Sequence, residues 1–165
     1  MTMLHGTAWV FGDRIGIEDI SPLRFMLDTA ERAAHCLERI DGEFAKVVRP
    51  GDIIVAGSLF GLGPGHDHAI LALKETGIAM IVARSFGFQF YRHAIDHGLA
   101  VREGDVFGHV ESGEPVVVDT SRNMLTVPST GHDFPLKAPE GPAADILAAG
   151  GLMPFLRRTL AGQGE

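Results

Sequence analysis

Short apolar runs alternate with segments of helical spacing in the middle of the chain. Residues 52–56 form an apolar run with β-branched side chains at its centre, which is typical of a buried strand. A glycine-rich stretch follows at 57–65. Residues 66–76 then carry alanine and leucine at helical intervals, and Gly77 stands where a left-handed residue would end that helix. This region therefore predicts a strand, a loop and a helix in succession.

The same order of elements repeats directly afterwards. A second apolar run covers 78–83, and Ser85 is a suitable N-cap for the next helix. Residues 86–97 have a helical pattern, and we expect their aromatic side chains in the core. A third strand begins at 99–101. Strands and helices that alternate and are connected by short loops predict a parallel sheet.

The flanks of this region predict elements of other kinds. Residues 105–136 contain three strand-like runs separated by Asp, Asn, Gly and Ser, which is typical of antiparallel β-structure. Near the start, residues 28–39 have helical character, with their alanines and Leu37 on one face. Further helices are expected over 142–149 and 152–160. The predicted fold class is α/β, with a parallel α/β core and additional antiparallel β-strands.

Composition and charge narrow the class of protein. The chain has 165 residues, 45% of them hydrophobic, which predicts one domain over residues 1–165 with a substantial core. Acidic residues outnumber basic ones by 21 to 14, and the net charge of −7 argues against nucleic acid as a partner. We find neither an apolar run long enough for a membrane helix nor the pattern of a signal peptide. We therefore expect a cytoplasmic protein without a membrane partner.

Cys36 is the single cysteine of the sequence. One thiol excludes an intrachain disulfide, and it excludes an iron–sulfur cluster held by this chain alone, because such clusters usually need three or four thiolates. Cys36 lies beside apolar positions of the first predicted helix, so we expect a buried, inert thiol rather than a nucleophile. We expect neither a metal ion nor a cofactor bound by this chain.

The glycine-rich stretch 57–65 lies between the carboxyl end of a predicted strand and the start of a predicted helix. Ligands of open α/β sheets bind outside the carboxyl ends of the strands, and a helix N-terminus favours anions. The stretch therefore fits a carboxylate or phosphate site. It fits equally a tight structural turn whose glycines adopt positive φ.

A nucleotide site is a poorer fit. Gly61, Gly63 and Gly65 resemble a dinucleotide-binding loop, but the third glycine falls one residue short of the required spacing. The next strand ends at Arg84, where an NAD site would need an acid. A Walker A loop is excluded because the sequence contains no Gly-Lys pair.

Histidines provide the candidate proton-transfer groups. His66, Asp67 and His68 stand together at the start of the predicted helix, and His66 could pair with a carboxylate or act as a base. His93 and His97 have the i, i+4 spacing of a metal-binding pair. Near a helix C-terminus they fit better as a solvated face that favours positive charge.

Several motifs together resemble a known family, the small subunit of 3-isopropylmalate dehydratase, which is the swivelling domain of the aconitase superfamily. The resemblance lies in the segments 11–13, 20–22, 34–37, 41–44, 51–63, 67–69, 83–86, 90–95, 98–99 and 150–152. It covers nearly the whole chain in one order, and it implies a swivelling β/β/α domain.

The resemblance also implies an activity and a partner. In this family the small subunit docks on a large subunit that carries a [4Fe–4S] cluster, and a loop of the small subunit caps the site. Water is removed from a small hydroxy-carboxylic acid and added back. The single cysteine agrees with a chain that leaves the cluster to its partner.

This sequence departs from the family in the capping loop. The family pattern Ser-Ser-Arg, which supplies a serine base and a carboxylate-binding arginine, is absent; Pro64 and Gly65 stand at the serine positions and His66 at the arginine position. The candidate catalytic residues are His66, Asp67 and His68. The candidate substrate-binding residues, which include the segment matching the family's substrate-recognition loop, are Gly61, Gly63, Pro64, Gly65, Arg24, Phe25, Met26 and Leu27.

Three hypotheses about function follow. The chain is the small subunit of a hydro-lyase that acts on a different hydroxy acid, whose apolar substituent would meet the apolar side chains of 24–27. Alternatively, it is a non-catalytic partner that stabilises or regulates a large subunit. The third hypothesis is a stand-alone module that binds a small carboxylate, and the isolated chain could then form a homo-oligomer.

Overall fold

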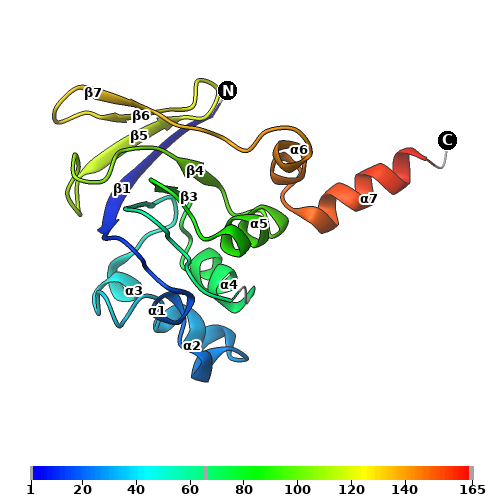
Figure 1. Ribbon diagram of the computed structural model, residues 1–165, viewed down its shortest axis with the longest axis horizontal. Helices are drawn as coiled ribbons and strands as arrows, with labels where there is room; N and C mark the ends of the chain where they lie inside the picture. Colours follow the sequence, from blue (N-terminus) through cyan, green and yellow to red (C-terminus); the bar gives the residue numbers. More distant parts are fainter. Residues whose placement is uncertain (1, 65–66, 164–165) are drawn as a thin grey trace.

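One seven-stranded mixed sheet organises the computed structural model, which describes residues 2–64 and 67–163 (Figure 1). The strand order across the sheet is β4-β3-β2-β1-β5-β6-β7. The strands are β1 (Met3–Phe11), β2 (Ile53–Ala56), β3 (Met80–Ala83), β4 (Val101–Glu103), β5 (Pro115–Asp119), β6 (Met124–Val127) and β7 (His132–Pro135). The α/β class with a parallel core and added antiparallel strands is confirmed.

β1 joins the two halves of the sheet. Its second half, from Ala8 to Phe11, pairs in parallel with β2, and β2 to β4 continue the parallel half. Its first half, from Met3 to Thr7, pairs antiparallel with β5, and β6 and β7 complete that half. The carboxyl ends of β1, β2 and β3 therefore lie at one edge, where the glycine-rich stretch begins.

Helices cover one face of the parallel half, with α4 and α5 lying beside one another in Figure 1. The helical segments are α1 (Ile17–Ile20), the 3₁₀ turn η1 (Leu23–Phe25), α2 (Thr29–Ala34), α3 (Phe44–Val47), α4 (Asp67–Glu75), α5 (Phe88–Asp96), α6 (Pro142–Ala148) and α7 (Leu152–Gly162). The described part of the chain has no helix long and apolar enough to cross a membrane.

Alternate residues of the central strands face two separate apolar clusters. Ile54 and Ile81 point to the helical side, where they pack with Leu73 and Phe90. Their neighbours Ile53 and Val82 point to the other side, into a cluster completed by valines and leucines of β5 and β6. Parallel strands buried on both faces read as continuous apolar runs, which explains why β2 and β3 are evident in the sequence.

The predicted helix over 28–39 is shorter than expected. Asp28 caps its start by accepting from the Glu31 N–H at 3.1 Å, but the helix ends at Ala34. Leu37 has φ +58, and this left-handed residue turns the chain out of the helix. The expected apolar face is wrong at the alanines, because Ala30 and Ala34 are exposed, whereas Leu37 is buried.

The helix over 86–97 also begins later than predicted. Gly87, not Ser85, is its N-cap, because the Ser85 hydroxyl accepts a hydrogen bond from the Leu59 N–H at 2.9 Å instead. Phe86 and Phe90 lie in the core as expected. Phe88 does not: its side chain is 77% exposed at the start of α5. The prediction that the aromatic side chains of 86–97 lie in the core is therefore wrong for Phe88, which faces solvent.

Candidate functional site

The glycine-rich stretch prolongs β2 as an irregular strand between two neighbouring segments. On one side, Arg14 N–H donates to the Ser58 carbonyl at 2.8 Å, and Ile17 N–H donates to the Leu62 carbonyl at 2.9 Å. On the other side, Gly87 N–H donates to the Phe60 carbonyl at 2.8 Å. The stretch is therefore held at the carboxyl edge of the sheet and is not a free loop.

The backbone amides of the first part of this stretch are already used. Ser58 N–H donates to Asp13 Oδ1 at 2.7 Å, and Phe60 N–H donates to the Ser85 carbonyl at 3.1 Å. Gly61 N–H donates to the Ile15 carbonyl at 2.7 Å. Up to Leu62 the stretch thus matches the structural-turn interpretation rather than an anion-binding nest.

Packing explains the glycine at position 61. Its φ is +81, and a Cβ there would lie 2.2 Å from the ring of Phe90. Gly61 is buried, whereas Leu62, Gly63 and Pro64 are exposed. Of the candidate binding residues in this stretch, Gly63 and Pro64 are therefore the accessible ones, and Gly65 lies outside the described residues.

A pocket of about 230 Å³ opens between the exposed part of the stretch and the segment of α1 and η1. Its lining is mostly apolar and includes Gly63, Pro64 and His68. Sequence analysis missed its other main members, Ile17, Glu18, Leu23 and Leu62. Leu23 directly precedes the predicted substrate segment 24–27. Its apolar side chain beside that segment was the sequence signal that could have identified it as a lining residue.

His68 lies at the inner side of this pocket. The residue is 4% exposed, and its Nε2 is 3.0 Å from the Ser21 carbonyl oxygen, so the imidazole links α4 to the segment after α1. The Glu18 carboxylate accepts from the Leu23 N–H at 3.1 Å. The pocket thus combines apolar walls with one buried imidazole and one carboxylate.

Asp67 faces away from the pocket toward α5. Its two carboxylate oxygens lie 2.8 Å from His93 Nδ1 and 3.3 Å from His97 Nε2. The two histidines therefore share a carboxylate rather than forming a fully solvated face. The third candidate catalytic residue, His66, lies outside the described residues.

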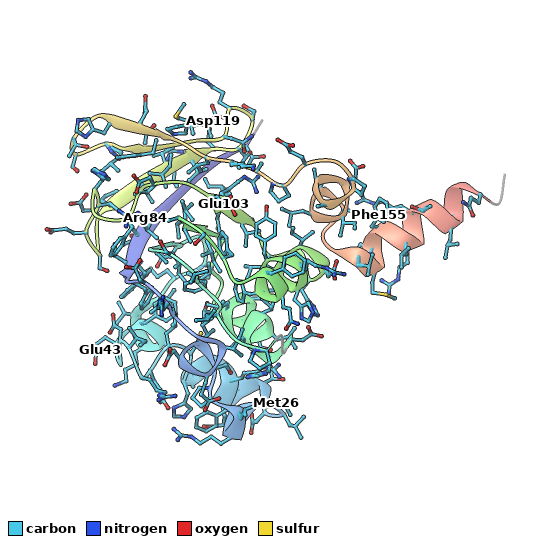
Figure 2. The ribbon with its side chains drawn as sticks, in the orientation of Figure 1. Met26, Glu43, Arg84, Glu103, Asp119 and Phe155 are labelled. Atoms are coloured by element: carbon cyan, nitrogen blue, oxygen red, sulfur yellow. The ribbon has the colours of Figure 1, made fainter. Side chains whose placement is uncertain are left out.

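The predicted substrate segment 24–27 lies at the same end of the molecule as α2, and Figure 2 shows Met26 there, far from Asp119 on the antiparallel half. Arg24 forms an ion pair with Glu38 at 2.7 Å, and its guanidinium lies over the ring of Phe25. Met26 and Leu27 are exposed, Leu27 by 90%. The segment borders the pocket through Leu23 but does not line it.

Arg32 fixes the position of this segment. Its guanidinium is 10% exposed, makes a two-point contact with the Glu75 carboxylate of α4, and donates to the Met26 carbonyl at 2.8 Å. The hydrogen bond that Arg32 donates to Glu75 raises the pKa of Arg32, so the charge is permanent. One side chain therefore ties η1 and α2 to the helix that follows the glycine-rich stretch.

Metal-ligating side chains do not gather in the described part of the chain. Among residues 2–64 and 67–163, no group of three or more His, Cys, Asp or Glu side chains has the arrangement of a metal site. Cys36 is fully buried, and burial raises the pKa of its thiol far above the usual range. Burial therefore favours the neutral thiol form of this cysteine and shields it from solvent.

Comparisons with known proteins agree in pointing to one family. The aconitase C-terminal domain matches residues 18–101. A 3-isopropylmalate dehydratase small subunit of Nautilia profundicola is 36% identical over 97% of this chain and 98% of its own length. A 2,3-dimethylmalate dehydratase small subunit of Eubacterium barkeri is 36% identical over 93% of this chain and 96% of its own.

A solved structure extends the likeness to the fold. A 3-isopropylmalate dehydratase chain from Methanocaldococcus jannaschii superposes with a TM-score of 0.94 at 34% identity, and the match covers 98% of each chain. The architecture described above is therefore shared by a structure determined for a dehydratase chain.

Proposed function

The chain belongs to the 3-isopropylmalate dehydratase small-subunit family of the aconitase superfamily, and from this premise we propose that it completes the active site of a heteromeric hydro-lyase. A large subunit would hold the [4Fe–4S] cluster, because the only cysteine of this chain is buried. When bound there, the cluster supplies a Lewis-acidic iron. This chain supplies the surface that closes over the substrate.

The observation that carries the proposal is the exposed edge formed by Leu62, Gly63 and Pro64 above the pocket. Residues 57–61, which precede this edge, are held by hydrogen bonds to the segments on both sides. A segment with a fixed backbone and an exposed end is suited to contact a ligand that is held mainly by another subunit. It also keeps bulk water from the reacting bond.

The lining of the pocket supports a particular substrate class. Ile17, Leu23 and Leu62 offer apolar contact, and the Glu18 carboxylate would repel a second carboxylate. The pocket therefore suits the apolar substituent of a hydroxy acid, while the substrate carboxylates are bound elsewhere. The names of two relatives, which refer to isopropylmalate and dimethylmalate, support a malate with an alkyl substituent.

In the proposed reaction a C–H bond and the C–O bond on the adjacent carbon break, a C=C bond forms, and water leaves. The reverse reaction adds the proton and the hydroxyl group back. His66 is proposed to hold or move the proton, because imidazole titrates near neutral pH. Asp67 is held by His93 and His97, so it would fix the start of α4, the helix that follows His66 in the sequence.

The test is anaerobic co-purification with a large subunit of the same family, followed by a screen of alkyl-substituted malates. Leu62→Asp should raise the KM for an alkyl-malate at least 10-fold and leave the KM for unsubstituted malate nearly unchanged. A 10-fold change corresponds to about 1.4 kcal/mol of lost selectivity. Leu160→Asp is the matched control, because Leu160 is exposed on the distant helix α7.

His66→Ala tests catalysis separately from binding. We expect kcat to fall by about 10²-fold or more with assembly intact, as for loss of an acid–base group. If the complex of large and small subunits is active and its kcat is unchanged by His66→Ala, then His66 has no catalytic role. A pair that assembles but dehydrates none of the hydroxy acids would favour a stabilising or regulatory subunit.

A further inference from the structure

A second cavity lies at the opposite edge of the sheet from the glycine-rich stretch. It has a volume of about 350 Å³ and lies where β3 and β4 begin, beneath α6. Its walls are mostly apolar, with a few polar groups at one side. The lining residues used below are Met80, Ala100, Leu147, Arg102, Thr120 and Asn123.

Arg102 is the charged group of this cavity. Its Nε donates to Asn123 Oδ1 at 3.1 Å, and its Nη1 donates to the Val101 carbonyl at 2.9 Å. A guanidinium has five N–H donors, so several remain for another partner. Within residues 2–64 and 67–163, no carboxylate lies at ion-pair distance from Arg102. The cavity therefore contains a positive charge without its usual counterion.

The surroundings make this charge costly. Burial lowers the pKa of Arg102, and the ionisable group that opposes this effect is the phenol of Tyr91. Glu103 and Glu140 act on Tyr91, whose pKa is raised chiefly by its own burial. A partly desolvated guanidinium gains from an anion that accepts two parallel N–H bonds, which is the geometry of a carboxylate.

We propose that this cavity binds a small monocarboxylate with an apolar body, with Arg102 holding the carboxylate group. Thr120 and Asn123 flank the charged end, and Met80, Ala100 and Leu147 contact the apolar body. A dicarboxylate is disfavoured because its second charge would lie against apolar walls. The volume is near the lower end of known ligand pockets, about 300–1,000 Å³, so the ligand is small.

The site is separate from the one proposed for dehydration. The glycine-rich stretch follows the carboxyl end of β2, whereas Met80 and Ala100 stand at the amino ends of β3 and β4. Occupation of the cavity would also contact Leu147 of α6 and Leu4 of β1. The proposal therefore does not depend on the chain being a hydro-lyase subunit.

The experiment uses the full chain and 4-methylpentanoate as the probe, with binding measured by calorimetry and by amide shifts in NMR spectra. Shift changes should cluster around 80, 100–102, 120–123 and 144–148. The uncharged 4-methylpentanamide and the dicarboxylate 3-methylglutarate should bind at least 10-fold more weakly. Arg102→Gln should weaken 4-methylpentanoate binding at least 10-fold, and Arg157→Gln on α7 is the matched control.

A second variant guards against misfolding of Arg102→Gln. Ala144→Leu fills the cavity from α6 and keeps the charge, so it should also weaken binding at least 10-fold, whereas Ala161→Leu on α7 should not. Equal binding of the acid and its amide, shift changes confined to the glycine-rich stretch, or unchanged affinity in Ala144→Leu would each overturn the proposal. His66→Ala should bind the probe like the parent chain, which separates this site from the proposed dehydration site.

Discussion

Asp52 illustrates how a single buried carboxylate can join two strands. It is 6% exposed and accepts from Thr7 N–H at 3.1 Å, from the Trp9 indole N–H at 3.0 Å and from Arg49 N–H at 2.9 Å. The three donors come from β1 and from the turn before β2. The carboxylate therefore fixes the register in which β1 and β2 pair.

Removing this carboxylate should destabilise the protein without unfolding it. Asp52→Ala leaves three N–H donors without their acceptor, and we expect a loss of about 3 kcal/mol in the free energy of unfolding. Urea denaturation followed by the fluorescence of Trp9 measures the change. Glu111→Ala at an exposed position is the control, and a loss no larger than that of the control would contradict the assignment.

His35 is a residue whose protonation should stabilise the region of α2. A hydrogen bond to Glu38, together with one to Glu31 at 2.9 Å, raises the pKa of His35 above its usual 6.5. Because the folded pKa is raised, the stabilisation is complete below the unfolded pKa and is lost as the pH rises through the folded one.

NMR titration of the His35 ring protons tests this expectation. The folded chain should show a His35 pKa above 6.5, and Glu38→Gln should lower it toward that value. If the His35 pKa is the same in the parent and in Glu38→Gln, the hydrogen bond to Glu38 does not raise the pKa of His35.

At the scale of elements, Arg32 determines how η1 and α2 attach to the rest of the fold. The guanidinium joins α2 to Glu75 of α4 and to the Met26 carbonyl. Arg32→Met should therefore lower the free energy of unfolding by about 3 kcal/mol, because Glu75 keeps a partly buried charge without its partner.

The variant should also loosen the segment next to the pocket. We expect faster hydrogen exchange at 24–28 in Arg32→Met, measured by mass spectrometry. Arg39→Met is the matched control, because Arg39 is exposed and its ion pair with Asp19 is 3.9 Å long. Equal exchange in the two variants would show that Arg32 does not hold the segment.

The elements that the sequence predicts well are those buried on both faces. β2, β3 and the helices beside them are where the apolar runs place them, because burial on both sides leaves a continuous apolar signal. The helix over 28–39 is wrong in its second half because the left-handed Leu37 is set by tertiary contacts, and the burial of Arg32 in its first half depends on such contacts too. Propensity carries no information about such partners.

The candidate site could be predicted only in part. The glycine-rich stretch and its place at the carboxyl edge follow from the order of strands and helices. Ile17, Glu18 and Leu23 come from elsewhere in the chain, and tertiary contacts such as the hydrogen bonds between 15–17 and 61–62 bring them to the pocket. Asp67 was predicted as a catalytic residue, and its contact with two histidines of α5 depends on how the helices pack.

At the scale of the whole molecule, α7 extends away from the sheet as an arm (Figure 1). None of its residues, all of which the structure describes, is buried. Leu160→Ala should therefore change the free energy of unfolding by less than about 0.5 kcal/mol. The same substitution at Leu73, which is fully buried in α4, should cost about 3 kcal/mol.

Urea denaturation of both leucine variants measures this difference. A cost at Leu160 that approaches the cost at Leu73 would mean that α7 folds back onto the sheet in solution. The comparison uses one chemical change at two positions, so the difference reports burial alone.

The divided pairing of β1 has a consequence for how the chain is made. Ala8 to Phe11 need β2, which follows within fifty residues, but Met3 to Thr7 need β5, which leaves the ribosome much later. During synthesis the first half of β1 therefore has no strand to pair with until β5 has been made. Vectorial folding should complete the parallel half first, and the antiparallel half should close last as the slow, long-range step.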